Sequence, residues 1–427
     1  MVSQRLILTG AGACLAIGAI AGPANAQVAY DRDHNISVQQ RAYDEHAPLG
    51  IGLGGFLLFP QLDLGVEYND NIFAATANET EDTILVAGAS ARLASQWSRH
   101  ALNFFGGVQS RTFTDNEDDN AVDWRLGADG RLDIIRDMHI AGGAAFGRTT
   151  ESRFAGNGPA NLVEPIEYDF EEAHGELVRD VNRIRAGISF AYGKYDYKDG
   201  QVFAGPVFEQ DDRDNDVLDI TGRLDYALSP DTAVFGSVTH RARDYDLDSG
   251  TANGGPILDR DSEGWRYLIG ANFDITSVVR GEAAVGYSTT EYDAAAFADV
   301  DGFSAYGQAE WFVTKMTSIT ANASRETVDA GISGAAGIQR TSIGVRADHE
   351  LRRDIILFGG VSLDQDEYQS FDRDDDRTRF NVGVDWYANR LLKVGAGYER
   401  FEQESTGVNK DRDFTGNVFA LRASLRR

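Results

Sequence analysis

The amino-acid sequence predicts an all-β fold, a transmembrane antiparallel up-and-down β-barrel of about 18 strands. Three observations predict it. Apolar and polar residues alternate along most of the chain, short turns alternate with longer acidic loops, and tryptophans gather near the segment ends. After residue 27 no window approaches 18 consecutive apolar residues, so a membrane-spanning helix is not expected.

Residues 1–26 are expected to be a cleaved secretory signal peptide. Arg5 supplies the basic region, residues 6–21 the apolar stretch and residues 24–26 an A-x-A cleavage motif. A lipoprotein signal acylated at Cys14 is the weaker alternative, because apolar sequence continues well past this cysteine. Cleavage removes Arg5 from the 40 basic residues and leaves 39 against 67 acidic ones, a net charge of −28. It also removes the single cysteine, so no disulfide, thiolate nucleophile or cysteine metal site is expected.

The composition excludes two classes of protein. The 427-residue chain has a formal charge of −27, and nucleic acid is not an expected partner because phosphate binding requires clustered lysine and arginine. A hydrophobic content of 42%, with 10% aromatic residues, is too high for a disordered acidic chain. The sequence therefore describes a folded, strongly acidic protein.

Strand-forming segments of roughly 10 to 14 residues follow one another from about Phe56 to the end of the chain. In residues 121–135, for example, Trp124 and Leu126 stand at even-numbered positions, whereas Arg125 and Arg131 stand at odd-numbered ones. Alternation with a period of two is typical of a strand with two different faces.

The connections between these segments alternate in length. Longer acidic loops include residues 115–120, 156–165, 210–216, 249–262 and 364–376. Eight tight turns, spaced 37 to 48 residues apart, are predicted near Ser98, Arg136, Val181, Ser229, Thr276, Thr314, Arg352 and Asn389. Nine such loops with eight turns connect 18 strands, the pattern of an outer-membrane barrel.

A soluble propeller or β-helix is the alternative fold, since propeller blades repeat at a similar spacing. A blade needs four short strands, whereas each repeat here holds two long ones. The tryptophans also favour the barrel: they lie near tight turns or where strands leave long loops, as an aromatic girdle requires. These residues are Trp97, Trp124, Trp265, Trp311 and Trp386.

Three regions are therefore expected: the signal peptide (residues 1–26), a periplasmic N-terminal arm (27–55) and an outer-membrane barrel (56–427). Residues 27–52 lack alternation and are expected to be a mobile arm or a small plug.

The first barrel segment carries a family resemblance. Residues 65–73, with the sequence GVEYNDNIF, resemble the opening signature of the putative β-barrel porin 2 family of Gram-negative bacteria, and the resemblance extends from about Phe56 to the C-terminus. It implies an outer-membrane barrel. Several members of the family are associated with loci for exopolysaccharide synthesis and export, so the resemblance also implies a role in that process. The chain departs from the usual assembly signal because it ends in Arg427 rather than in an aromatic residue.

The polar face of each strand gives an inventory of candidate lumen residues, because 18 strands enclose a lumen too wide for side chains alone to fill. The basic members are Arg125, Arg131, Arg183, Arg185, Arg223, Arg241, Arg266, Arg280, Arg340, Arg346, Arg379 and Arg422. The acidic members are Asp129, Glu172, Glu176, Asp219, Asp225, Glu282, Glu310, Asp348, Asp385 and Glu399. Twelve against ten is nearly balanced.

Two interpretations of the lumen arginines follow. They could form a ladder for an anionic or hydroxyl-rich solute, since guanidinium groups match carboxylates. They could instead pair with neighbouring lumen carboxylates and stiffen the wall. Balanced numbers favour pairing, and they count against a strongly anionic polymer as the transported substrate.

The excess acid must lie in the loops and the arm. One interpretation is an acidic mouth that concentrates cations; the other is that acidic loops solvate the surface and bridge to lipopolysaccharide through divalent ions. The two are not exclusive. The candidate mouth residues are Asp118, Asp119, Asp212, Asp214, Asp216, Asp374, Asp375 and Asp376.

No catalytic residue, metal site or cofactor is predicted, and the protein is not expected to be an enzyme. Residues 212–216 have the acid spacing of a calcium loop, but Val217 replaces the required glycine. Of the seven histidines, His174 and His240 lie on predicted strands, and neither has a serine or aspartate partner that the sequence can place within hydrogen-bond reach.

The sequence thus predicts a porin-like channel for passive passage of hydrophilic solutes. Export of exopolysaccharide is the finer role that the resemblance implies, and a structural or adhesive barrel without an open pore is the alternative. Loops of about 20 residues, at 198–216 and 245–264, could fold inward as a constriction. Expected partners are outer-membrane lipid and lipopolysaccharide, a hydrophilic solute or polysaccharide, and a periplasmic export partner.

Overall fold

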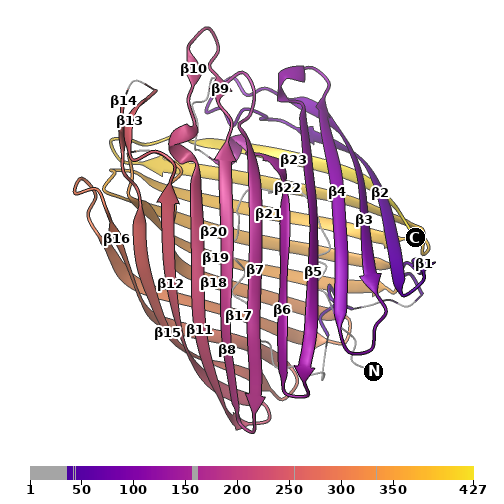
Figure 1. Ribbon diagram of the computed structural model, residues 1–427. Coiled ribbons are helices and arrows are strands. Elements are labelled where there is room, and N and C mark those ends of the chain that lie inside the picture. Colours follow the sequence, from indigo (N-terminus) through magenta and orange to yellow (C-terminus); the bar gives the residue numbers. More distant parts are fainter. Residues whose placement is uncertain (1–35, 42, 44, 156–161, 254, 333) are drawn as a thin grey trace.

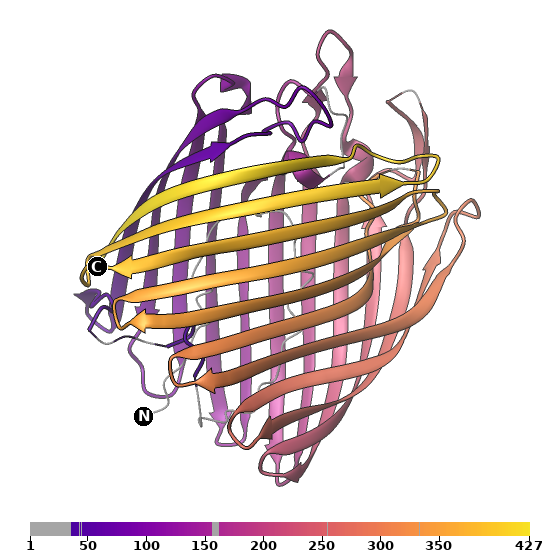
Figure 2. The same cartoon turned by 180° about the vertical axis from the view of Figure 1, so that it is seen from behind.

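The computed structural model describes residues 36–41, 43, 45–155, 162–253, 255–332 and 334–427. Within them, 18 long antiparallel strands form one closed barrel (Figures 1 and 2). The barrel strands are β2 (Phe56–Asn69), β3 (Asp82–Ser95), β4 (Ala101–Phe113), β5 (Ala121–Ile135), β6 (Met138–Thr150), β7 (Glu167–Val181), β8 (Ile184–Tyr197), β11 (Asn215–Ser229), β12 (Thr232–Tyr245), β15 (Ser262–Ile275), β16 (Val279–Tyr292), β17 (Val300–Thr314), β18 (Thr317–Val328), β19 (Gly337–Arg352), β20 (Ile355–Gln369), β21 (Asp374–Tyr387), β22 (Leu392–Thr406) and β23 (Phe414–Arg426). The predicted fold class is confirmed.

The barrel closes where the last strand pairs with the first. β23 runs antiparallel to β2 from Gln61↔Arg426 to Asn69↔Val418. The terminal residue does not prevent closure: the backbone N–H of Arg427 donates to the carbonyl of Pro60 at 3.1 Å. Closure leaves no edge strand, which matters because lipid offers no partner for an unpaired backbone group.

Eight short connections join strands at one end of the barrel, which we call the turn end. They contain two to five residues and fall where the sequence predicts them. Asn182, in the two-residue turn between β7 and β8, adopts a left-handed backbone with φ of 55°, a conformation that asparagine tolerates better than most residues. In outer-membrane barrels the short turns face the periplasm.

Nine connections lie at the other end, the loop end, and eight of them contain seven or more residues. The three longest are residues 151–166, 198–214 and 246–261, and each of the last two carries a small hairpin (Figure 1). The short elements at the two ends are β1 (Ile51–Leu53), which pairs with β2, β9 (Gly200–Gln201), β10 (Val207–Phe208), β13 (Ser249–Ala252), β14 (Gly255–Leu258) and the 3-10 turns η1 (Glu117–Asp119), η2 (Arg153–Ala155) and η3 (Asp211–Arg213).

One predicted loop is wrong. Residues 364–376 were expected to connect two strands, but β20 continues to Gln369 and β21 begins at Asp374, which leaves a four-residue turn. The acidic side chains that suggested a loop have partners across the wall: Asp366 accepts hydrogen bonds from Arg340 at 2.7 Å. Similarly, Asp216 belongs to β11 rather than to a loop.

The two faces of the wall differ as the alternation predicts. Large apolar side chains such as Leu64, Ile269 and Leu421 are 58 to 68% exposed on the outer face, and all five tryptophans are at least 36% exposed. Among the residues that the structure describes, the buried apolar ones form four small clusters rather than one core. No helix in the described part of the chain is long and apolar enough to cross a membrane.

A charge on the outer face should destabilise the barrel. Ile269 lies midway along β15 and is 68% exposed. We expect Ile269→Arg to cost about 2–4 kcal/mol, because a cation at the bilayer midplane loses its hydration. Urea unfolding in lipid vesicles, followed by tryptophan fluorescence and by the heat-dependent gel mobility of folded barrels, measures this cost. Ile269→Leu is the control, and equal unfolding midpoints for the two variants would place this face away from lipid.

Candidate channel lumen

The charged residues predicted for the lumen lie on strand positions that alternate with the exposed apolar ones. Arg125, for example, stands between Trp124 and Leu126, whose side chains are both on the outer face. Because successive side chains point to opposite faces of a strand, the charged residues face the interior. Arg183 is the exception in the inventory, since it lies in the turn between β7 and β8.

The most buried charge cluster on the inner wall surrounds Arg223 of β11. Its guanidinium lies 2.8 Å from Asp225 and 2.8 Å from Glu282, with these three side chains 9%, 1% and 11% exposed. The same guanidinium stands over the Phe235 ring, 3.7 Å from its centroid, and the Tyr306 hydroxyl donates to Glu282. Both buried carboxylates thus share one guanidinium, and Glu282 also accepts the Tyr306 hydroxyl, which satisfies groups that would be costly to bury alone.

Most other charged lumen residues also have polar or charged partners. Asp129 accepts a hydrogen bond from the Asn103 amide at 2.7 Å, and Glu176 lies 3.9 Å from His139. Further ion pairs include Arg125–Glu172 at 2.9 Å, Arg131–Asp133 at 2.9 Å, Arg185–Asp180 at 2.5 Å, Arg241–Asp219 at 2.7 Å, Arg266–Glu326 at 3.4 Å, Arg280–Glu310, Arg346–Asp348 at 2.8 Å, Arg379–Glu399 at 3.2 Å and Lys393–Asp385 at 3.0 Å. These contacts support pairing over a free arginine ladder. The sequence inventory missed Asp133, Asp180, Glu326 and Lys393.

A cavity of about 1020 Å³ lies inside the barrel against part of the wall. The described residues that line it come from β2 to β8, β11, β12, β15 and β17. Its lining combines paired charges such as Arg125 and Arg223 with hydroxyls such as Thr221 and with a cluster of Tyr168, Phe170 and Tyr195. Such a lining offers donors, acceptors and apolar surface to a small solute.

The loop end is held together by five arginines, which we call the loop arginines: Arg153, Arg213, Arg260, Arg373 and Arg412. Arg153 donates to the Asp119 carboxylate at 2.5 Å and to the carbonyl of Leu162 at 3.0 Å. Arg412, from the loop before β23, donates to the carbonyl of Arg153 at 2.6 Å. Two loops that lie far apart in the sequence are thereby joined.

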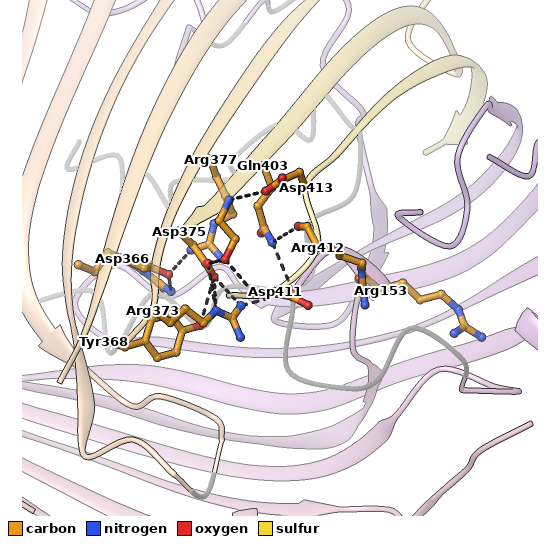
Figure 3. Close-up of polar contacts among 12 residues, drawn as sticks. Arg153, Asp366, Tyr368, Arg373, Asp375, Arg377, Gln403, Asp411, Arg412 and Asp413 are labelled. Carbon is orange, nitrogen blue, oxygen red and sulfur yellow. Dashed lines mark hydrogen bonds and ion pairs between the residues drawn. The ribbon is translucent and has the colours of Figure 1, made fainter. Parts of the chain in front are cut away.

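The other three loop arginines continue this chain of contacts. Arg213 pairs with Glu151 at 2.7 Å, and Arg260 donates to the carbonyl of Asp212 at 2.5 Å and to that of Ile332 at 3.1 Å. Arg373 lies 2.5 Å from Asp375 and 3.4 Å from Asp411 (Figure 3).

Buried loop acids take part in the same system. Burial raises the pKa of Asp329, but the guanidinium groups of Arg243 and Arg260 outweigh that effect and lower the pKa to about 2. The Tyr245 hydroxyl also donates to Asp329. The loops at this end are therefore linked by charge and hydrogen bonds, with small apolar clusters beside them.

The acidic mouth predicted from the sequence needs correction. Asp119, Asp212 and Asp375 are 4%, 6% and 0% exposed instead of facing solvent. The carboxylates of Asp119 and Asp375 accept from Arg153 and Arg373, and Asp212 accepts from Arg260 through its backbone carbonyl. Asp374 and Asp376 are exposed but lie on the outer face of β21, on the opposite parity to Asp375. The other three candidates, Asp118, Asp214 and Asp216, are exposed or partly exposed.

One group of carboxylates could in principle approach a metal ion. Among the described residues, Asp248, Asp259 and Asp261 place their ligand atoms within 4.8 Å of one another. Asp261 already accepts a hydrogen bond from the backbone N–H of Tyr245 at 2.6 Å. The group therefore has a structural role in the loop before β15.

A contact that the sequence did not predict lies at the turn end. The arm was expected to be more mobile than folded, but Ser37 and Val38 are 1% and 2% exposed, and Arg41 lies 2.5 Å from Glu350 of β19. Residues 36–41, 43 and 45–50 therefore contact the barrel wall, about 300 positions away in the sequence. No local sequence signal could have revealed such a contact.

A closed barrel with a polar, cavity-bearing interior and an apolar outer band defines an outer-membrane channel protein. The model of the putative beta-barrel porin 2 family matches residues 44–427, so the chain belongs to this family of outer-membrane, non-enzymatic barrels. The resemblance in the first barrel segment is thus confirmed. In a comparison with curated proteins, no significant match is found.

Several solved structures are similar in fold at low sequence identity. Pseudomonas aeruginosa OpdL is 10% identical with a TM-score of 0.45, over 88% of this chain and 99% of that one. Pseudomonas aeruginosa OpdK, solved with vanillate, is 10% identical with a TM-score of 0.46, over 87% and 99%. Acinetobacter baumannii OccAB4 is 10% identical with a TM-score of 0.45, over 91% and 100%.

Removing the buried arginine of the inner wall should destabilise the barrel far more than removing an exposed one. Arg223→Met leaves Asp225 and Glu282 buried without their cation, and we expect a loss of about 3–5 kcal/mol in unfolding free energy. Arg125→Met removes an exposed pair, with side chains 52% and 30% exposed, and should cost under about 1 kcal/mol. Urea unfolding in detergent compares the two, and equal losses would contradict this ranking.

The loop between β8 and β11 should become more stable as pH falls. Burial raises the pKa of Asp214 to about 7, with help from Asp196, Asp211 and Asp246, although the N–H of Tyr197 donates to it. The pKa of Asp214 is higher in the folded protein than in the unfolded chain, so ionising this carboxyl destabilises the fold. The destabilisation is absent below the unfolded pKa. It grows between that pKa and about pH 7, and it stays constant at higher pH.

Limited proteolysis of this loop tests the pH effect. Cleavage of the wild type should slow from pH 8 to pH 5, when corrected for the protease's own pH profile on an unfolded substrate. Asp214→Asn should remove most of that pH dependence. A pH dependence that survives in Asp214→Asn would assign it to another group.

Proposed function

We propose that this protein is a passive outer-membrane channel for small hydrophilic solutes. The observation that carries the proposal is the cavity of about 1020 Å³ inside the barrel, which is lined by paired charges, hydroxyls and aromatic side chains. Its charges are paired with one another, so the wall presents donors and acceptors without a strong net charge. A wall of this kind suits solutes that are neutral or weakly charged.

Export of an exopolysaccharide is the finer role that the family resemblance suggests. A strongly anionic polymer would be held by excess positive charge on the wall, and the lumen arginines are already paired. A neutral or weakly charged polymer stays compatible with this wall, and its export would require a periplasmic export partner at the turn end. The expected surroundings of the outer face are outer-membrane lipid and lipopolysaccharide.

A structural or adhesive barrel is the second candidate, favoured by one observation. The loop arginines join loops across the barrel, as Arg412 does with the carbonyl of Arg153. A rigid set of surface loops would suit adhesion as well as transport, and the two functions differ in whether ions pass.

Single-channel recording in planar bilayers under a salt gradient tests the proposal. We expect a stable conductance with mild cation preference, because acidic residues outnumber basic ones by 67 to 40 in the chain. The preference should weaken from 0.1 M to 1 M salt, as the Debye length falls from about 10 Å to about 3 Å. Silence from protein with the heat-dependent gel mobility of a folded barrel would favour the structural candidate.

Liposome swelling then defines the class of solute. Neutral sugars should enter faster than carboxylates of similar size, because the paired wall offers no uncompensated cation to an anion. Faster entry of the carboxylates would contradict the proposal that the paired wall favours neutral solutes.

A further inference from the structure

We propose that the N-terminal arm, held in the turn end of the barrel by Arg41, forms a constriction that sets the conductance and size limit of the channel. The arm is here defined as residues 36–41, 43 and 45–50. The inference rests on the proposed channel function and adds to it the element that determines which solutes pass.

The arm enters the barrel rather than lying outside it. Ser37 and Val38 are 1% and 2% exposed. The backbone N–H of Val38 donates to the Ser318 hydroxyl of β18 at 3.0 Å, and Arg280 of β16 donates to the Gln40 side chain at 3.1 Å. Both wall residues lie in the first two positions of their strands after a short turn.

Arg41 is the main electrostatic anchor of the arm. Its guanidinium lies 2.5 Å from Glu350 of β19 and donates to the carbonyl of Lys315 at 2.6 Å. The Tyr43 hydroxyl donates to the same Glu350 carboxylate at 3.1 Å. Glu350 is 7% exposed, so loss of Arg41 would leave a nearly buried carboxylate without its cation.

A second set of contacts fixes the end of the arm nearer to β1. Arg390 and Arg426 donate to the carbonyls of Glu45 and His46, at 3.2 and 3.0 Å. The rings of Tyr43 and His46 lie 6.3 and 6.2 Å from that of Tyr387. The arm is therefore tied to wall positions from β16 to β23, always at the turn end.

The cavity and the arm lie against different parts of the barrel wall. The described residues lining the cavity belong to β2–β8, β11, β12, β15 and β17, whereas the arm contacts β16, β18, β19, β21 and β23. Solute space and arm thus occupy different sides of the lumen. A docked arm narrows the way out at the turn end, and an undocked arm would leave it wider.

Charge reversal tests the anchor. Arg41→Glu and Glu350→Arg should each raise single-channel conductance roughly twofold, because the open cross-section of the pore increases, and should admit larger sugars into liposomes. The double variant should restore the wild-type values. Arg352→Glu is the matched control: Arg352 lies two residues from Glu350, is exposed and pairs with Asp354 at 3.0 Å, and its reversal should leave conductance unchanged.

A second readout follows docking without relying on conduction. The single cysteine of the chain, Cys14, lies in the expected signal peptide, so Ser37→Cys supplies one reporter thiol in the mature protein. A water-soluble maleimide should label this thiol slowly in the otherwise wild-type protein, severalfold faster with Arg41→Glu, and slowly again in the charge-swapped double variant.

The outcomes separate the two proposals. Faster labelling with higher conductance supports the constriction. Rapid labelling already in the Ser37→Cys protein, or released arms with unchanged conductance and sugar size limit, overturns it while the channel function stands. Silence in all folded variants overturns the channel function and the constriction with it.

Discussion

Closure of the wall is the constraint on which the structure depends. Inside a bilayer each backbone N–H and C=O must be paired within the protein, so β23 must meet β2 or the sheet would expose two edges to lipid. Side chains reinforce this seam on its inner face. Glu67 of β2 receives Arg422 of β23 at 2.7 Å and Arg111 of β4 at 3.1 Å, and the Ser424 hydroxyl donates to Asp63 at 2.5 Å. The seam thus combines backbone pairing with a buried, compensated charge.

Closure also determines how the interior is used. Eighteen strands enclose more space than the inward side chains fill. Paired charged side chains line the wall, the arm fills part of one side of the lumen, and a cavity remains on the other side. Pairing is favoured because an isolated charge at low dielectric costs more than a compensated one. The wall is polar, yet little of its charge is free to attract an ion. The transport properties therefore depend on the shape of the lumen as much as on the sign of the charge on its wall.

Much of the fold could be predicted because lipid imposes a simple rule on every strand. Because the outer face must be apolar, Leu62, Leu64 and Val66 at alternate positions indicate β2. The eight tight turns are recognised where this alternation stops. Contacts between distant segments could not be predicted in this way. Residues 364–376 looked like a loop because the arginines that donate to Asp366 lie on β19 and β21. The arm looked mobile because Glu350, the partner of Arg41, lies about 300 positions away in the sequence. The local sequence around a residue does not identify a contact partner that is distant in the sequence.

The loop arginines bear on how this surface can diversify. Arg412 and Arg260 bond to backbone carbonyls of other loops, and a carbonyl is present whichever side chain its residue carries. The contacted loops can therefore exchange their outward side chains without loss of these bonds, provided that their length and path are kept. Substitutions that alter recognition by phages or antibodies should be tolerated at such positions, whereas insertions that shift a carbonyl should not. In these loops the outward side chains face the surroundings, whereas the backbone carbonyls hold the loops together.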